Sequence, residues 1–432
     1  MTDKTGIHRS IGDAGRYRQP AALPAGRYHW RMALPQTAGC WLVAGVLVLS
    51  LFAATAPSPL YRVYQDQLRF SALTLTAIFA VYSVAVLITL LMFGSVSDYV
   101  GRRPVIIATL AVNMGGCALF LAAHSVGLLV AARVLQGAAV GAGEGALGAA
   151  MIDLQPSGSS LASVGTSAGN FLGQGTGALC TSLLAQYGPA PTKLIWWLLL
   201  GGLAAAAAGI FVMPEPGAGR PGVLASLRPH VGVPRRARVA FVVATPCLIA
   251  AWGLCGFYLS LGPSLALQVI GSPNLGWGGL VIFLLTGVAA AAAVAGAGIP
   301  AGRAMLAGCL ILLAGVAITF GAVAIGTAAA FLAGTAVAGV GFGLAFLGAF
   351  RMVTALAPPA ERAGLVAAIF IVNFLAFSIP AVIAGWAVIR YGLHRTALVY
   401  CAVVAALAAA AAGSLIVHSH ARRTSATVHS GQ

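Results

Sequence analysis

The sequence predicts an all-α membrane protein with twelve transmembrane helices, arranged as two six-helix bundles around a central cavity. Three observations predict the helical membrane class: 60% of the 432 residues are hydrophobic, only 7% are charged, and the apolar residues form long uninterrupted runs. A soluble chain of this length cannot cover so much apolar surface. In lipid every backbone N–H and C=O must be paired internally, and runs of about 20 apolar residues achieve this as helices.

Twelve apolar runs are long enough to cross a bilayer. The first six cover residues 36–57, 71–94, 104–123, 126–151, 159–186 and 192–213, and the second six cover 240–262, 277–298, 303–325, 328–353, 361–388 and 392–417. The polar stretch 214–239 separates the two sets. The sequence therefore predicts a cytoplasmic N-terminal tail (1–35), an N-terminal six-helix bundle (36–213), a central cytoplasmic loop (214–239), a C-terminal six-helix bundle (240–417) and a cytoplasmic C-terminal tail (418–432).

The net charge of +16 would suggest a nucleic-acid partner in a soluble protein, but here the basic residues follow the predicted topology. With the N-terminus inside, eighteen of the 24 Lys and Arg residues fall on the cytoplasmic side, five fall outside, and Arg133 lies within a span. Cytoplasmic loops of membrane proteins carry this excess of positive charge. We therefore expect a multi-pass protein of the bacterial inner (cytoplasmic) membrane, with both termini cytoplasmic and no nucleic-acid partner.

The two predicted halves resemble each other in sequence. A shift of 200 positions places seven residues of the fourth span, among them Gly141 and Gly143, on identical residues of the tenth. A shift of 203 places Asn170-Phe171-Leu172 on Asn373-Phe374-Leu375. A six-plus-six parallel repeat is the geometry in which a central cavity forms between two halves.

A short motif follows the second predicted span. It reads Gly94-Ser-Val-Ser-Asp98-Tyr-Val-Gly101-Arg102-Arg103. It resembles the cytoplasmic-loop signature of the major facilitator superfamily, G-x-L-A-D-[RK]-x-G-[RK]-[RK], from which Val96 and Tyr99 depart. The resemblance implies a gating loop in which Asp98 accepts hydrogen bonds that hold the inner gate shut, supported by Arg102 and Arg103, while the glycines allow a tight turn. The alternative is an ordinary positively charged cytoplasmic loop.

The fourth predicted span carries a second resemblance to that family, Leu129-x-x-x-Arg133-x-x-Gln136-Gly137. Glu144 lies eleven residues after Arg133, close to three full turns, so both side chains share one helix face. The other seven acidic residues lie in the tail, in loops or at the ends of predicted spans, and charges inside a span mark ion or substrate pathways. We expect Glu144, with Arg133, to couple proton movement to transport. The alternative is a hydrated structural carboxylate near the inner end of the span.

Polar residues within the spans are candidates to line a substrate cavity. They are Gln136, Asn170, Gln174, Tyr258 and Asn373, with Gln268 nearby. Asn170 and Gln174 are four residues apart, so they share one face of the fifth span. Each candidate is equally suited to an interhelical hydrogen bond.

Glycines recur every four residues on two spans and predict close helix packing. One ridge contains Gly137, Gly141 and Gly145, and the other contains Gly165, Gly169, Gly173 and Gly177. The antiporter motif of the resembled family, with its Gly-Pro pair, would fall in this region of the fifth span. Here Gln174 occupies the proline-like position, so the ridge favours packing over drug/proton antiport.

Together with the resemblance, these features predict a secondary active transporter, not an enzyme, that works by alternating access, with proton-coupled efflux of a small molecule as the first expectation. No nucleotide-binding loop and no metal-ligand spacing is present in the sequence, so we expect no cofactor and no metal. The expected partners of this monomer are the lipid bilayer, a small-molecule substrate and a proton. The alternatives are an importer of a sugar or organic acid, with Arg133 binding an anion, and a membrane sensor or scaffold without a transport cycle.

Overall fold

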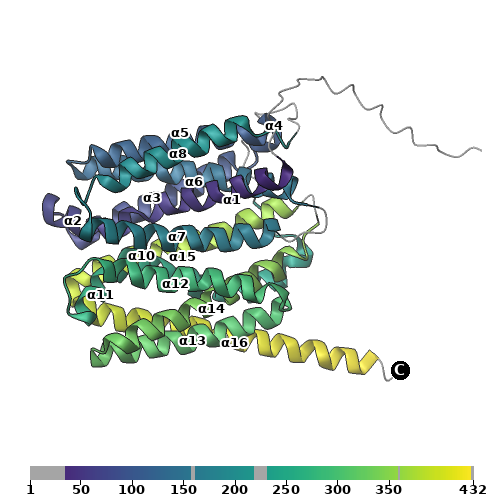
Figure 1. Ribbon diagram of the computed structural model, residues 1–432. Coiled ribbons are helices and arrows are strands. Elements are labelled where there is room, and N and C mark those ends of the chain that lie inside the picture. The colour runs from purple at the N-terminus through teal and green to yellow at the C-terminus, as the bar shows by residue number, and fades with distance from the viewer. Residues whose placement is uncertain (1–34, 157–160, 218–230, 359–360, 430–432) are drawn as a thin grey trace, which may run out of the picture. The chain divides into compact units, whose positions relative to one another are not determined.

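In a computed structural model the described residues are 35–156, 161–217, 231–358 and 361–429, and they lie within one compact unit, Leu34–Gln432 (Figure 1). The predicted N-terminal tail and residues 218–230 of the predicted central loop lie outside the described residues. Helices account for nearly all of the described chain, which confirms the all-α class.

The first half consists of eight helices. They are α1 (Gln36–Thr55), α2 (Pro57–Leu68), α3 (Ala72–Phe93), α4 (Ser97–Val100), α5 (Arg102–Leu121), α6 (Val126–Leu154), α7 (Leu161–Tyr187) and α8 (Leu194–Val212). The second half begins with a short 3-10 helix. Its elements are η1 (Arg235–Ala237), α10 (Arg238–Ser260), α11 (Gly262–Ile270), α12 (Gly276–Ala295), η2 (Gly296–Gly298), α13 (Ala301–Ile325), α14 (Ala328–Thr354), α15 (Arg362–Tyr391) and α16 (Leu393–His429).

Eleven helical segments within the described residues are long and apolar enough to cross a membrane, with α1 and α2 taken together as one span. Helix α7 is the twelfth long helix of the predicted set. It has 27 residues and packs between α1 and α12. Its glycines, Asn170 and Gln174 lower its hydropathy, because this helix faces other helices on several sides instead of lipid. The prediction of about twelve transmembrane helices is confirmed.

Two short helices extend spans that the sequence predicted to end in loops. Helix α2 continues α1 beyond Ala56, and α11 continues α10 beyond Leu261. A proline stands near the start of each, where its missing N–H breaks no helical hydrogen bond. The buried Tyr61 and Tyr64 hold α2 against the bundle. Both extensions lie at the same end of the helices, here called the α2 end, and the opposite end is here called the α4 end (Figure 1).

The two predicted glycine ridges pack as expected, but each has its own partner helix. A Cβ atom on Gly137 or Gly141 would collide with backbone atoms of α3, and one on Gly145 would lie 2.5 Å from the carbonyl oxygen of Gly94. A Cβ atom on Gly173 would lie 2.5 Å from the carbonyl oxygen of Val48 in α1. Gly177 meets Thr55 and Phe52 of the same helix. The ridges therefore join α6 to α3 and α7 to α1.

The glycine contacts also correct the register of the internal repeat. Gly141 packs against α3, but Gly341, its match at a shift of 200, packs against Leu312 of α13. The glycine that packs as Gly141 does is Gly343, which lies against Ala289 of α12. A shift of 202 therefore aligns the packing of α6 and α14. Two residues turn a helix by about 200°, so the sequence match alone places the glycines on opposite faces.

The halves touch each other along α7 and α12 and between α3 and α15. Figure 1 shows α7 and α12 side by side at the centre. A Cβ atom on Gly279 would meet the side chain of Ser182, and one on Gly385 would meet Thr76. At the α2 end, Tyr187 Oη accepts a hydrogen bond of 2.8 Å from Asn274 Nδ2, and Gln186 Oε1 accepts one of 2.9 Å from the Leu275 amide.

Candidate functional site

Arg133 is buried near the middle of the first half, with 1% of its surface exposed. Its Nη1 atom donates hydrogen bonds to the carbonyl oxygen of Ala54 at 2.7 Å and to Gln136 Oε1 at 3.1 Å. The guanidinium carbon lies 4.3 Å from the ring centroid of Tyr82, and 5.9 Å from those of Tyr61 and Phe79. Hydrogen bonds and aromatic faces thus compensate for the water that the charge has lost.

Gln136 works with Arg133 in joining α6 to the last turn of α1. Its side chain is fully buried, and Nε2 donates a hydrogen bond of 3.0 Å to the carbonyl oxygen of Ala53. Both oxygens, of Ala53 and Ala54, lie in the final turn of α1, where carbonyl groups lack intrahelical partners. Gln136 does not line the central cavity described below, which corrects its predicted place beside a substrate. Its contacts are those of an interhelical tie.

Glu144, Asn170 and Gln174 form a chain of polar side chains from α6 across α7. Asn170 Nδ2 donates to Glu144 Oε1 at 3.1 Å, and Gln174 Nε2 donates to Asn170 Oδ1. The second carboxylate oxygen of Glu144 is buried and has no hydrogen-bond partner. The two ion pairs among the described residues both involve Arg102, so Glu144 is not paired with Arg133. Among the described residues, the carboxylate is held by the single amide of Asn170.

A central cavity of about 30 Å³ lies between the halves and is lined by both predicted coupling residues and by two of the predicted substrate residues, Asn170 and Gln174. From the first half, its polar lining consists of Thr55, Tyr82, Arg133, Glu144, Asn170 and Gln174. From the second half, its lining is apolar or aromatic and consists of Trp252, Leu259, Phe370, Phe374 and Phe377. Leu51, Ala54 and Phe79 complete it. This volume holds one or two water molecules, whereas a drug-sized ligand needs roughly 300 Å³ or more.

Phe171 contributes the first half's side chain to an aromatic cluster next to this cavity. Its ring lies 4.8 Å from that of Phe342, 5.7 Å from that of Phe346 and 6.5 Å from that of Trp252. On the other side of the cavity, the rings of Phe79 and Phe377 lie 4.8 Å apart. Aromatic contacts between the halves therefore flank the cavity, and they must separate before anything larger than water enters.

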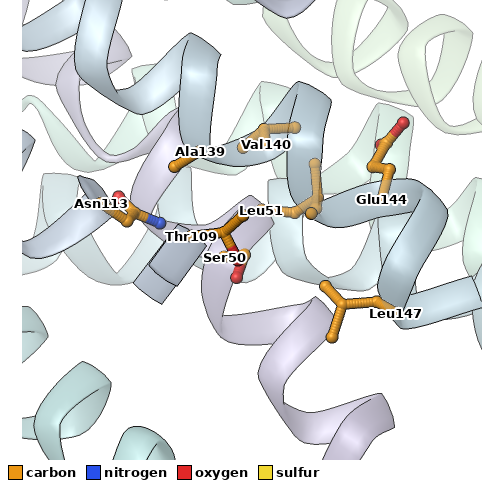
Figure 2. Close-up of a pocket in the computed structure, with 9 residues that line it drawn as sticks. Ser50, Leu51, Thr109, Asn113, Ala139, Val140, Glu144 and Leu147 are labelled. Atoms are coloured by element: carbon orange, nitrogen blue, oxygen red, sulfur yellow. The ribbon is translucent and has the colours of Figure 1, made fainter. Parts of the chain in front are cut away.

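A smaller cavity of about 10 Å³ lies behind Glu144, among α1, α5 and α6 (Figure 2). Ser50, Thr109 and Asn113 give it a polar lining. Asn113 is 1% exposed and its Oδ1 atom has no hydrogen-bond partner. Figure 2 shows the carboxylate of Glu144 turned away from Ser50 and Asn113. Glu144 therefore lines both cavities, with its carboxylate pointing away from the polar groups of the smaller one.

Three other predicted substrate residues lie outside the central cavity lining. Tyr258 is buried, and its hydroxyl lies 2.8 Å from Thr335 Oγ1, with either oxygen able to donate. Asn373 is 1% exposed, and neither atom of its amide has a hydrogen-bond partner. Gln268 is exposed on α11. These three side chains are not among the residues that line this cavity, and their predicted place beside a substrate stays a prediction.

The predicted gating loop forms a polar cluster at the α4 end. Arg102 pairs with Asp98, and its Nε donates a hydrogen bond of 3.1 Å to Asp153 at the end of α6. Arg103 donates to the carbonyl oxygen of Phe211 and lies over its ring, 4.8 Å from the centroid. Gly101 adopts a φ of 107°, which explains why a glycine stands there. Gly94 directly follows α3.

Glu215 and Asp153 belong to this cluster, although sequence reasoning missed them. The carboxylate of Glu215 accepts hydrogen bonds from the backbone N–H groups of Arg102 at 2.7 Å and Arg103 at 3.1 Å. It thus caps the first turn of α5, whose amides have no intrahelical partner. The position of Glu215, just after a predicted span and on the same side as the arginines of the gating loop, could have predicted this contact.

Comparisons with known proteins agree with this architecture. The family profile described as Major Facilitator Superfamily matches residues 43–379. The crystal structure of the human organic anion transporter MFSD10 (TETRAN) is similar, with a TM-score of 0.59 and 18% identity, over 88% of this chain and 100% of that chain.

A second similar structure is that of a single-residue mutant of the nucleoside transporter NupG. The TM-score is 0.64 and the identity 12%, over 86% of this chain and 99% of that chain. A sequence comparison with curated proteins gives no match. Both structural likenesses concern the fold, whereas the family profile covers most of the chain. This multi-pass membrane protein, with a cavity between two halves of related packing, belongs to the Major Facilitator Superfamily of transporters.

Proposed function

We propose that the chain is a secondary active transporter that exports a small molecule by alternating access, in exchange for protons carried by Glu144. The observation that carries the proposal is the state of this carboxylate. It lines the central cavity, one oxygen accepts a hydrogen bond from Asn170, and the other oxygen is buried without a partner. A carboxylate that is so sparsely compensated gains from binding a proton whenever water or substrate leaves.

Arg133 serves this cycle as a fixed element. Its charge lines the same cavity but is held by Ala54, Gln136 and the ring of Tyr82. In this proposal Glu144 titrates and Arg133 sets the electrostatic potential around it.

The contacts between the halves support alternating access. The α2 end is held by Tyr187 with Asn274, by Gln186 with Leu275, and by the Ser182–Gly279 contact. Aromatic side chains close the cavity between these contacts and the α4 end. Tilting one half against the other would open either end in turn, around a carboxylate that stays near the middle.

We place the α4 end in the cytoplasm, because the basic residues of the gating loop lie there. Arg102, Arg103 and Arg351 all fall on that side in the positive-inside arrangement. The protein would then be a monomer of the inner membrane with both termini cytoplasmic.

The test uses cells that express the wild type or Glu144→Gln, loaded with the compound that most raises the unfolding temperature of the purified protein. Glu144→Gln keeps the hydrogen bond to Asn170 and cannot bind a proton. We expect wild-type cells to expel the compound faster in the presence of an inward proton gradient, and the variant to ignore that gradient. Accumulation in wild-type cells would identify an importer. A level equal to that in cells without the protein would favour a sensor or scaffold.

A further inference from the structure

We infer that the substrate of the central cavity is a monovalent organic cation with an aromatic body, and that the carboxylate of Glu144 is its counter-ion. The inference rests on the proposed function and names its substrate class. Two independent features of the cavity support it: the negative sign of its less compensated charge, and the aromatic side chains of its walls.

Of the two charges in the cavity lining, the negative one has fewer partners. Arg133 and Glu144 are the charged residues in its lining, and the charge of Arg133 is engaged by the Ala54 carbonyl oxygen, Gln136 and three aromatic rings. Glu144 has one amide donor, no ion pair among the described residues, and one buried oxygen without a partner. The Nε atom of Arg133 is also buried without a partner among the described residues, but the other contacts of this side chain leave the carboxylate as the less compensated charge that a ligand would meet.

The walls of the cavity also favour a positively charged ligand. Six aromatic rings line it: Phe79, Tyr82, Trp252, Phe370, Phe374 and Phe377. Their faces attract cations, and they also offer flat apolar area to an aromatic body. Trp252 is buried, with 5% of its surface exposed, and its indole N–H lacks an acceptor among the described residues. An acceptor atom on the ligand would satisfy it.

The lining argues against the two other substrate classes considered from the sequence. A sugar needs many hydrogen-bonding groups around it, and the second half contributes mainly hydrocarbon to the cavity. An organic acid could reach the unpartnered Nε atom of Arg133, but its negative charge would then lie in the same cavity as the unpaired carboxylate oxygen of Glu144. Both would leave buried polar groups uncompensated.

This assignment explains how exchange would be coupled. A monovalent cation and a proton compete for one carboxylate, so the carrier returns with a proton each time it releases the substrate. One positive charge leaves and one enters, and the exchange is electroneutral. The membrane potential should then have little effect on the exchange, whereas the pH difference should drive it.

The test compares two probes of nearly the same size and shape but opposite charge, tetraphenylphosphonium and tetraphenylborate. Binding to the purified full chain in detergent is measured by calorimetry at neutral pH. We expect tetraphenylphosphonium to bind about tenfold or more tightly than tetraphenylborate. Glu144→Gln should abolish that preference, Glu144→Asp should retain it, and Phe374→Ala should weaken the binding of tetraphenylphosphonium without changing the sign of the preference.

Three results would overturn the inference: no binding of tetraphenylphosphonium to the folded wild type, equal or tighter binding of tetraphenylborate, or an unchanged preference in Glu144→Gln. These outcomes are distinct from failure of the proposed function. Proton-driven export of a neutral or anionic compound, without phosphonium binding, would contradict the cation assignment but not the proposed function. Glu144-dependent phosphonium binding without any flux would contradict the transport cycle but not the cation assignment.

Discussion

At the scale of single residues, Arg133 combines hydrogen bonds and ring contacts that lysine cannot reproduce. Its planar guanidinium donates to two acceptors and stacks over Tyr82. We expect Arg133→Lys to lower the free energy of unfolding by about 1–3 kcal/mol, because buried acceptors lose their donor. Thermal unfolding in detergent measures this. Tyr82→Phe keeps the ring face and should leave the midpoint nearly unchanged, so an equal loss in both variants would contradict the stacking argument.

Sequence reasoning reached some of these residues and missed others for a physical reason. Helical spacing places Arg133 and Glu144 on one face, and the structure brings both to the central cavity. Spacing cannot tell which neighbouring helix a polar side chain will meet. The prediction therefore placed Gln136 in the cavity, whereas in the structure its side chain forms a hydrogen bond from α6 to α1. The aromatic wall of the second half was missed, because phenylalanine in an apolar helix carries no signal of a cavity.

At the scale of helices, the glycine ridges leave no room for a side chain. A Cβ atom on Gly141 would collide with Thr89 and with the carbonyl oxygen of Val86, and would lie 3.0 Å from the Leu90 amide nitrogen. We expect Gly141→Ala to destabilise the protein by about 1–3 kcal/mol, because α3 has to move away. The unfolding midpoint of the purified variant measures this.

Gly45 provides the matched control within α1, since nothing lies within 4 Å of the position of its Cβ atom. Gly45→Ala should be neutral or stabilising by up to about 1 kcal/mol, because alanine is the better helix former. Equal midpoints for Gly141→Ala and Gly45→Ala would show that α6 and α3 are not packed as closely as described.

Hydropathy predicted the long helices well, but it did not predict where the chain stays helical outside them. Residues 57–68 contain prolines, charges and tyrosines, which the sequence alone suggests as a loop, yet they form α2. The buried Tyr61 and Tyr64 provide tertiary contacts that outweigh this polar composition. The register of the repeat was wrong by two residues for the same reason: it depends on which helix each glycine touches.

At the scale of the whole molecule, the proposed transport cycle requires the two halves to separate at the α2 end once in every cycle. Tyr187 and Asn274 face each other across this boundary. We expect the double variant Tyr187→Cys/Asn274→Cys, in a Cys180→Ser background, to stop transport when a short bifunctional methanethiosulfonate reagent is added. Reduction should restore transport. Cys180 is the exposed native cysteine and the other six are buried, so one background substitution is sufficient.

The single variants Tyr187→Cys and Asn274→Cys serve as controls, because the reagent can attach to each of them but cannot bridge the halves. Flux of the exported compound into and out of proteoliposomes is the measurement. Full activity in a completely cross-linked double variant would show that this end does not have to open.

The contact between α7 and α12 also determines what kind of movement the protein can make. Here Gly175 lies against Thr286 and Gly279 against Ser182, so the two backbones already touch near the middle of the molecule and towards one end. In the proposed transport cycle this contact would act as a pivot, because the two helices cannot slide apart without losing it. The displacement would then be greatest at the two ends and least near the cavity, so a molecule bound at mid-depth would be exposed first to one compartment and then to the other while hardly moving itself.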